Sequence, residues 1–164
     1  MRKHKKHLPV FGKRLTEREI AVITLFWQGR SSTEVADILF ISKRTVDSYA
    51  NATYVKLGAH GRLDACNKAI SLGIIVLPER TDHSSGSRKP RLTKREKEVL
   101  KLVARGLGNK QVAEVFGVKD GTVDFHLGNI NDKLQTMNRI QAVRAALQLG
   151  LISADTLIQK GSVK

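Results

Sequence analysis

The chain has almost no cysteine, few aromatic residues and no long hydrophobic run, and each shortage excludes a class of protein. Cys66 is the only cysteine among 164 residues, so no disulfide forms within the chain, and the composition fits a reducing cytosol. Cys66 also falls on an apolar helix stripe, which predicts a buried small hydrophobe rather than a nucleophile. No apolar run reaches about 18 residues and no signal-peptide core follows the amino terminus, so neither a membrane span nor a secretion signal is predicted.

Acidic residues are also scarce. The chain has 29 Lys and Arg against 15 Asp and Glu, a net charge of +14. The first 14 residues contain several basic side chains and no acidic one. This balance indicates a polyanionic partner, most often nucleic acid, while a solvated basic tail remains the alternative for the amino-terminal segment.

Patterns typical of enzymes are missing from the sequence. There is no nucleophile–base arrangement, no paired-carboxylate site and no phosphate-binding loop. His4 and His7 lie close together, but no cysteine or carboxylate joins them as a metal ligand. We therefore expect neither catalytic activity nor a cofactor or metal ion.

What the chain does contain is an internal repeat. Residues 15–75 align with residues 92–152 at a constant offset of 77 without a gap, with 20 identities in 61 positions. A unit of this length, present twice, predicts two copies of one small domain rather than a solenoid. The residues between the copies are rich in Pro, Ser, Gly and charge and predict a flexible linker. The predicted organisation is a basic arm at 1–14, domain 1 at 15–77, a linker at 78–91, domain 2 at 92–153 and a tail at 154–164.

Each repeat predicts four helices, so the fold class is all-α. The first helix follows a capping box, Thr16-x-x-Glu19 in repeat 1 and Thr93-x-x-Glu96 in repeat 2. The third helix is predicted at about 43–57 and 120–134, and the fourth at 62–72 and 139–149. In the third helix of repeat 1, the predicted inward residues are Val46, Tyr49 or Ala50, Thr53 and Leu57. In the third helix of repeat 2, they are Val123, Leu127, Ile130 and Leu134.

The second helix is short, and a tight connection joins it to the third. Its predicted buried face is Val35, Ala36, Ile38 and Leu39 in repeat 1, and Val112, Ala113, Val115 and Phe116 in repeat 2. Trp27 and Phe40 are also interpreted as core residues. A short helix, a tight turn and a third helix packed on one side only is the helix-turn-helix plan, whose third helix can enter the major groove of DNA.

These residues resemble a known family. Repeat 2 contains LTKRE at 92–96, NKQVA at 109–113, TVDFHLGNI at 122–130 and KL at 133–134. This frame is similar to the LuxR-type (GerE-type) helix-turn-helix domain of bacterial transcription regulators, and repeat 1 keeps much of the same frame. The resemblance covers about three quarters of the chain. It implies two small four-helix DNA-binding domains whose fourth helices commonly form a dimer interface.

The resemblance also implies which residues of the third helices face DNA. The base-facing positions are Asp47, Ser48 and Asn51 in repeat 1, and Asp124, Phe125 and Gly128 in repeat 2. Phenylalanine can pack on a thymine methyl group, whereas Gly128 offers almost no contact. The phosphate contacts carried over are Lys43, Arg44, Thr45, Lys56, Thr122, His126, Asn129 and Lys133.

Both repeats depart from the family at the first base-facing position, where lysine is frequent. Asp47 and Asp124 can accept a hydrogen bond from cytosine N4, but nearby phosphates repel them. The two aspartates therefore narrow the sequence specificity, lower the affinity for DNA or indicate a helix that recognises DNA poorly, and these alternatives stay open. Repeat 1 also has Tyr49 at the family's histidine.

Three hypotheses follow for function. The first is a sequence-specific, cytoplasmic and nucleoid-associated DNA-binding transcription regulator, either paired within one chain or forming a homodimer through the fourth helices. The second is a degenerate module that binds another regulator or RNA polymerase, and the third is a non-specific nucleic-acid-binding protein. We expect no receiver or ligand-sensing domain in 164 residues, so that abundance or a partner sets the activity.

Overall fold

The structure, a computed structural model, describes residues 14–77 and 90–158. The chain divides into two compact units, and every regular element within those residues is a helix. The prediction of two small all-α domains is therefore confirmed. The predicted linker and the basic arm fall mainly outside the described residues, as do His4 and His7.

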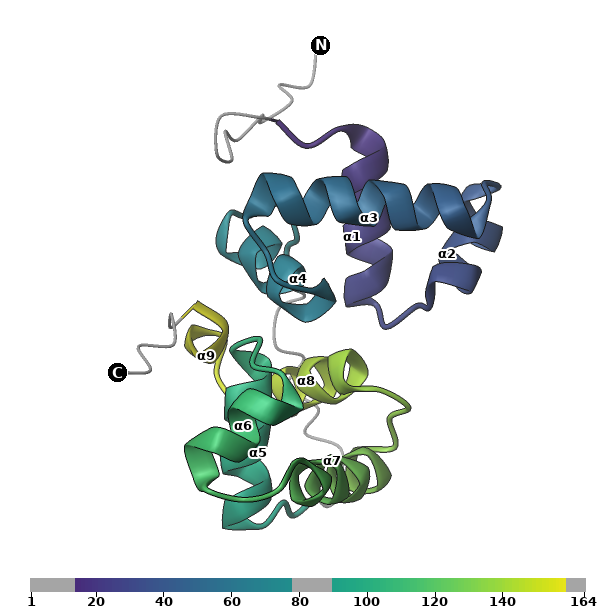
Figure 1. The fold of residues 1–164 in the computed structure, drawn as a ribbon. Helices are drawn as coiled ribbons and strands as arrows, with labels where there is room; N and C mark the ends of the chain where they lie inside the picture. The colour runs from purple at the N-terminus through teal and green to yellow at the C-terminus, as the bar shows by residue number, and fades with distance from the viewer. Residues whose placement is uncertain (1–13, 78–89, 159–164) are drawn as a thin grey trace. The chain divides into compact units, whose positions relative to one another are not determined.

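The described residues of the first unit form four helices, which Figure 1 shows in purple to blue. The long helix α3 crosses α1, with α2 at its amino-terminal end and α4 at its carboxyl-terminal end. The predicted bounds of the third helix are confirmed. The helices are α1 (Glu17–Trp27), α2 (Ser32–Leu39), α3 (Lys43–Leu57) and α4 (Arg62–Ser71).

The second unit repeats this order and adds one short helix, which packs against α5. The third helix of the repeat, α7, packs against α5, α6 and α8. The helices are α5 (Lys94–Ala104), α6 (Asn109–Phe116), α7 (Asp120–Leu134), α8 (Arg139–Gln148) and α9 (Asp155–Ile158). Among the described residues, no helix is long and apolar enough to cross a membrane.

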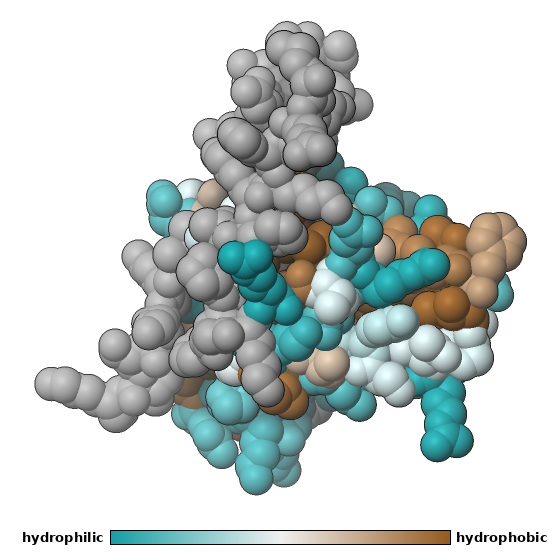
Figure 2. All heavy atoms as spheres, turned by 90° about the horizontal axis from the view of Figure 1, so that it is seen from above, coloured by the Kyte–Doolittle hydropathy of each residue, from teal (hydrophilic) through white to brown (hydrophobic). Residues whose placement is uncertain are grey.

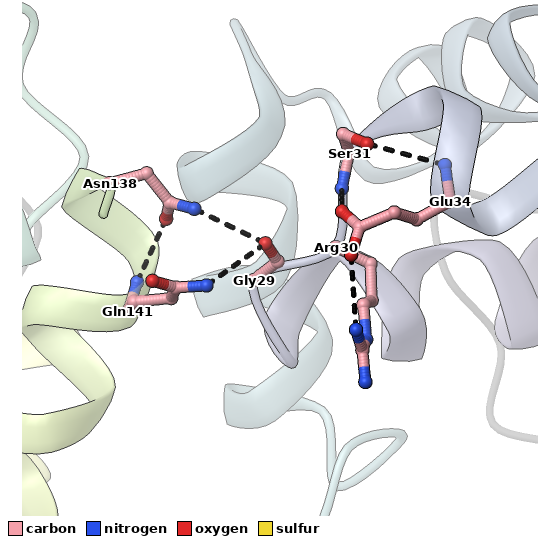
Figure 3. Close-up of polar contacts among 6 residues, drawn as sticks. All are labelled: Gly29, Arg30, Ser31, Glu34, Asn138 and Gln141. Atoms are coloured by element: carbon pink, nitrogen blue, oxygen red, sulfur yellow. Dashed lines mark hydrogen bonds and ion pairs between the residues drawn. The ribbon is translucent and has the colours of Figure 1, made fainter. Parts of the chain in front are cut away.

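Capping boxes mark the starts of α1, α2 and α5. The predicted capping boxes form at Thr16 and at Thr93, where each hydroxyl accepts from a backbone N–H and the glutamate three residues on accepts in return. Ser31 and Glu34 make the same box at α2, and Arg30 donates to the Glu34 carboxylate at 3.0 Å (Figure 3). These bonds satisfy backbone donors that the first turn of a helix leaves unpaired, so they fix where α1, α2 and α5 begin.

The third helices bury one face, as the periodicity predicts. Val46, Ala50, Thr53 and Leu57 are buried in α3, so Ala50 rather than Tyr49 takes the inward position. The buried residues of α7 are Val123, Leu127, Ile130 and Leu134. Burial on one side only leaves the opposite side of each helix exposed.

The buried face of the second helices is narrower than predicted. Ile38 and Val115 are 45% and 46% exposed, and Leu39 and Phe116, which were also predicted to be buried, are half-buried. Phe40 is 94% exposed, so its interpretation as a core residue is wrong, whereas Trp27 is buried. Phe40 ends α2 in the left-handed conformation, with φ 53°, and the chain reverses there with the side chain on the outside. Figure 2 shows hydrophobic surface on the side of the molecule where α2 leads into α3.

Cys66 is buried in α4, as predicted for a small hydrophobic residue. Burial raises the pKa of its thiol to about 12, and the positive charge of Arg62 only partly opposes this. The thiol is therefore protonated at neutral pH and is a poor nucleophile.

Candidate nucleic-acid interface

The turn between the second and third helix is built in the same way in both units. Phe40 and Gly117 each adopt a left-handed conformation, with φ 53° and 63°. The Ser42 hydroxyl then accepts from the backbone N–H of Thr45 at 3.1 Å and starts α3. In the second unit Lys119 takes the cap position without a side-chain bond. In both units the third helix thus follows a left-handed residue two positions before its N-cap, and only the N-cap bond differs.

The outward face of α3 carries the residues predicted to face bases. Asp47 is half-buried, while Ser48 and Asn51 are exposed. The Ser48 hydroxyl donates to the Arg44 carbonyl at 3.0 Å, which occupies its hydrogen. The exposed amide of Asn51, able to donate and accept together, is therefore the best-suited hydrogen-bonding group for a base edge on this face.

Basic charge gathers at the first turn of α3. Lys43 and Arg44 are exposed there, directly after the turn. The Thr45 side chain is half-buried, and its hydroxyl lies 2.8 Å from the Ser42 hydroxyl. Exposed cations at the start of a one-sided helix are suited to phosphate oxygens on either side of a groove.

The outward face of α7 is less polar. Phe125 is 66% exposed, and its ring meets His126 edge-on with 5.9 Å between ring centroids. Thr122 and Gly128 are exposed, and a Cβ added at Gly128 would meet only open space. Asn129 is half-buried. This face therefore offers an aromatic ring beside an empty position rather than a row of hydrogen-bond donors.

Two of the predicted phosphate contacts are held in ion pairs inside their own unit. The Lys56 Nζ lies 2.8 Å from the carboxylate of Glu19, and the Lys133 Nζ lies 2.7 Å from that of Glu96. Both glutamates are buried, with 3% exposed. The same glutamates close the capping boxes of α1 and α5, so each pair ties the first helix of a unit to the end of the third.

Acid should lower the stability of both units by protonating these two glutamates. Burial raises the pKa of Glu19 and Glu96, but hydrogen bonds from the paired lysine and the capping backbone outweigh burial and leave each pKa below 4.5. A carboxyl group with a lowered pKa in the folded state stabilises the fold above its unfolded pKa, and this contribution is lost as the pH falls through the folded pKa. Urea unfolding at a series of pH values should therefore show the free energy of unfolding falling below about pH 4.5. A free energy that does not change between pH 6 and pH 3 would contradict this.

Asp124 belongs to a polar network that joins three helices. The Asn109 amide nitrogen donates to the Asp124 carboxylate, and the Asn109 carbonyl oxygen accepts from the Arg139 guanidinium. Asn109 and Arg139 are the first residues of α6 and α8. Burial lowers the pKa of Arg139, and the negative charge of Asp124 opposes this.

The first unit has a related network. Arg62, the first residue of α4, donates to the Ser32 hydroxyl at 3.0 Å. Burial raises the pKa of Tyr54, a hydrogen bond with Arg62 lowers it, and the negative charge of nearby Asp47 raises it. By the repeat offset of 77 residues, Ser32, Asp47 and Arg62 are the equivalents of Asn109, Asp124 and Arg139 of the second unit.

Sequence reasoning missed both the glutamate–lysine pairs and the two arginines. Their partners lie 37 residues apart for each ion pair and 30 residues apart for each arginine contact, so no local pattern reveals them. One signal was present: Arg62 and Arg139 are identical residues at equivalent positions of the repeat, and so are the members of the two ion pairs.

Comparison with known proteins identifies relatives for both units. The family described as "Bacterial regulatory proteins, luxR family" matches residues 13–69 and 90–146, which together make up more than half of the chain.

Individual relatives match one or both units. The chain is 44% identical over 61 residues to the transcriptional activator protein AnoR of Acinetobacter nosocomialis, covering 37% of this chain and 26% of that protein. It is 40% identical over 76 residues to the transcriptional regulatory protein DesR of Bacillus subtilis (strain 168), covering 46% and 38%. A longer match, 24% identical over 134 residues, joins it to the transcriptional activator protein EchR of Dickeya chrysanthemi, covering 81% and 48%. The chain thus spans less than half the length of each of these relatives.

Proposed function

The chain belongs to the luxR family of bacterial regulatory proteins, and on this basis we propose that it is a sequence-specific DNA-binding transcription regulator. In this proposal α3 and α7 each enter a major groove. The observation that carries it is the one-sided burial of these two helices, each presented after the same left-handed turn. A helix packed on one side and polar on the other fits the width of the major groove of B-form DNA.

Phosphate contacts in the proposal come from the first turn of α3 and from positions spread along α7. Lys43, Arg44 and Thr45 serve α3, and Thr122, His126 and Asn129 serve α7. Lys56 and Lys133 act differently, because their ammonium groups are paired with buried glutamates. These ion pairs hold α3 and α7 in place on the side away from the DNA. Exposed cations supply affinity that depends on salt, whereas paired ones contribute little to it.

Base contacts are proposed to differ between the units. In α3, Asn51 is suited to the N6 and N7 atoms of adenine and Asp47 to cytosine N4, with Ser48 beside them. In α7, Asn109 already donates to Asp124, so the exposed ring of Phe125 is the main contact and packs on a thymine methyl group. The two units would thus recognise different DNA sequences. Joining them in one chain compensates for a weak affinity of each single unit for DNA.

Further partners in the proposal are a second copy of the chain, paired through α4 or α8, and RNA polymerase. We expect the protein in the cytoplasm, associated with the nucleoid. The second candidate function is a protein-interaction module, favoured by the exposed Phe40 and Ile38 at the end of α2. An exposed hydrophobic cluster of this kind is more typical of protein contacts than of contacts with phosphate.

Selection of bound duplexes from a random DNA pool, at near-physiological salt, tests the proposed function. We expect a recovered motif with two half-sites, which differ because the outward faces of α3 and α7 differ. Binding that yields no motif and collapses as salt rises would show only charge-driven association and would favour the protein-interaction module.

A further inference from the structure

We propose that Asp124 is a positioning residue, which holds α7 against α6 and α8 through Asn109 and does not itself read a base. This inference rests on the proposed function, because it assigns a task to one residue of a proposed reading helix. It replaces a base contact at this position with an internal one.

The contacts place the Asp124 carboxylate in an intramolecular role. The side-chain amide of Asn109 is used at both ends, since its nitrogen donates to Asp124 and its oxygen accepts from Arg139. An amide held from both sides has one orientation, and it links the second turn of α7 to the first residues of α6 and α8. A change in any of the three residues should therefore alter how α7 sits on its supporting helices.

The network lies beside the part of α7 proposed to face the bases. The network lines a shallow surface hollow of about 530 Å³, and a Cβ added at Gly128, which lines the same hollow, would meet nothing. The hollow is lined by Asn109, Asp124, Leu127, Gly128, Asn131 and Arg139. A support at this point controls the angle at which Phe125 and its neighbours reach the groove.

Electrostatics favours the same role. A free carboxylate on a helix in the major groove would be repelled by the phosphates on both sides. An amide donor and the positive charge of Arg139 offset the negative charge of Asp124. Members of the family frequently have lysine at this position. The negative charge of an aspartate there must therefore be offset if the helix is to enter a groove.

The residue at the equivalent position of the first unit suggests a variant that removes one of the two hydrogen bonds of Asn109 and keeps the other. Ser32 stands at the equivalent position and accepts from Arg62 at 3.0 Å. Asn109→Ser therefore keeps an acceptor for Arg139 but removes the amide donor to Asp124, without changing the net charge. Asp124→Ala removes the same bond together with the charge. Asp120→Ala, one turn earlier on the exposed start of α7, removes an equal charge and serves as the matched control.

The experiment measures the affinity of each full-length variant for the selected DNA and for a scrambled duplex of the same composition. Asp124→Ala and Asn109→Ser should each lower the ratio of the two affinities about tenfold, comparable with one mismatched base pair, and the double variant should lower it no further. Asp120→Ala should raise both affinities and leave the ratio unchanged. Selection with Asp124→Ala should recover the wild-type motif.

Two results would overturn the proposal. If Asp124→Ala changes the preferred base pair at one position and Asn109→Ser does not, Asp124 is a base reader. If Asp124→Ala behaves like Asp120→Ala, it has no positioning role. Should the wild-type chain yield no motif, the proposed function fails, and thermal unfolding then tests the network by itself. Each single variant should lower Tm by roughly 2–5 °C with no further loss in the double variant, whereas additive losses would refute the network.

Discussion

Replacing both Lys43 and Arg44 with alanine should weaken the binding of the full chain to duplex DNA about thirtyfold at near-physiological salt. Both side chains are exposed at the first turn of α3, so their loss should leave the fold unchanged. Each phosphate contact releases about one counterion, and the slope of log affinity against log salt should therefore fall by about 2. Fluorescence anisotropy across a salt series measures both quantities.

The matched control for this prediction removes two other exposed lysines. Lys97 and Lys101 lie on α5, one turn apart, and belong to neither proposed reading helix. Their replacement by alanine lowers the net charge by the same amount and should change the slope by much less. Equal effects of the two double variants would mean that charge alone, and not the position of α3, governs binding.

Lys56→Met should destabilise the first unit by about 2–3 kcal/mol. The variant leaves the buried Glu19 carboxylate without its ammonium partner, which lies 2.8 Å away in the wild type. Removing one member of a buried pair costs more than the pair itself contributes, because a charge remains in a poorly solvated place. This cost lies at the low end for a buried pair because the Lys56 side chain is 20% exposed and Glu19 keeps its bond to the Thr16 backbone. Urea or thermal unfolding of the full chain measures the change.

Two further variants make this result specific. Glu19→Gln combined with Lys56→Met removes the buried charge while keeping a capping acceptor, so the double variant should be more stable than Lys56→Met alone. Lys68→Met breaks an ion pair of α4, between side chains 35% and 21% exposed, and should cost under about 1 kcal/mol. A cost for Lys56→Met no larger than that of Lys68→Met would contradict the structural role of the buried pair.

Local signals in the sequence were sufficient for most of the fold. The bounds of α3 were predictable because Ser42 can cap a helix and because Val46, Ala50, Thr53 and Leu57 recur at helical spacing. The gapless repeat then transferred the same bounds to α7. Capping boxes gave the starts of α1 and α5 for the same reason, since the bonds join residues only three apart.

Contacts between distant residues were not predictable in this way. Hydropathy alone placed Phe40 in the core, but the left-handed turn that ends α2 directs an apolar residue outward. The frame of the family assigned Lys56 to phosphate, whereas the fold brings it to Glu19 across 37 residues. Asp124 likewise meets Asn109 across 15 residues, and a single sequence holds no signal for that pairing.

The proposal that α3 and α7 enter the major groove is tested most directly by protection of guanine N7 from methylation on the selected DNA, because this atom lies in the major groove. We predict two protected segments. Arg44→Glu should abolish the protection of the segment bound by α3. Thr122→Asp places a negative charge against the phosphates at α7 and should abolish the protection of the other segment. Protection that neither variant alters, or specific binding without protection of any guanine in the motif, would contradict recognition by these two helices.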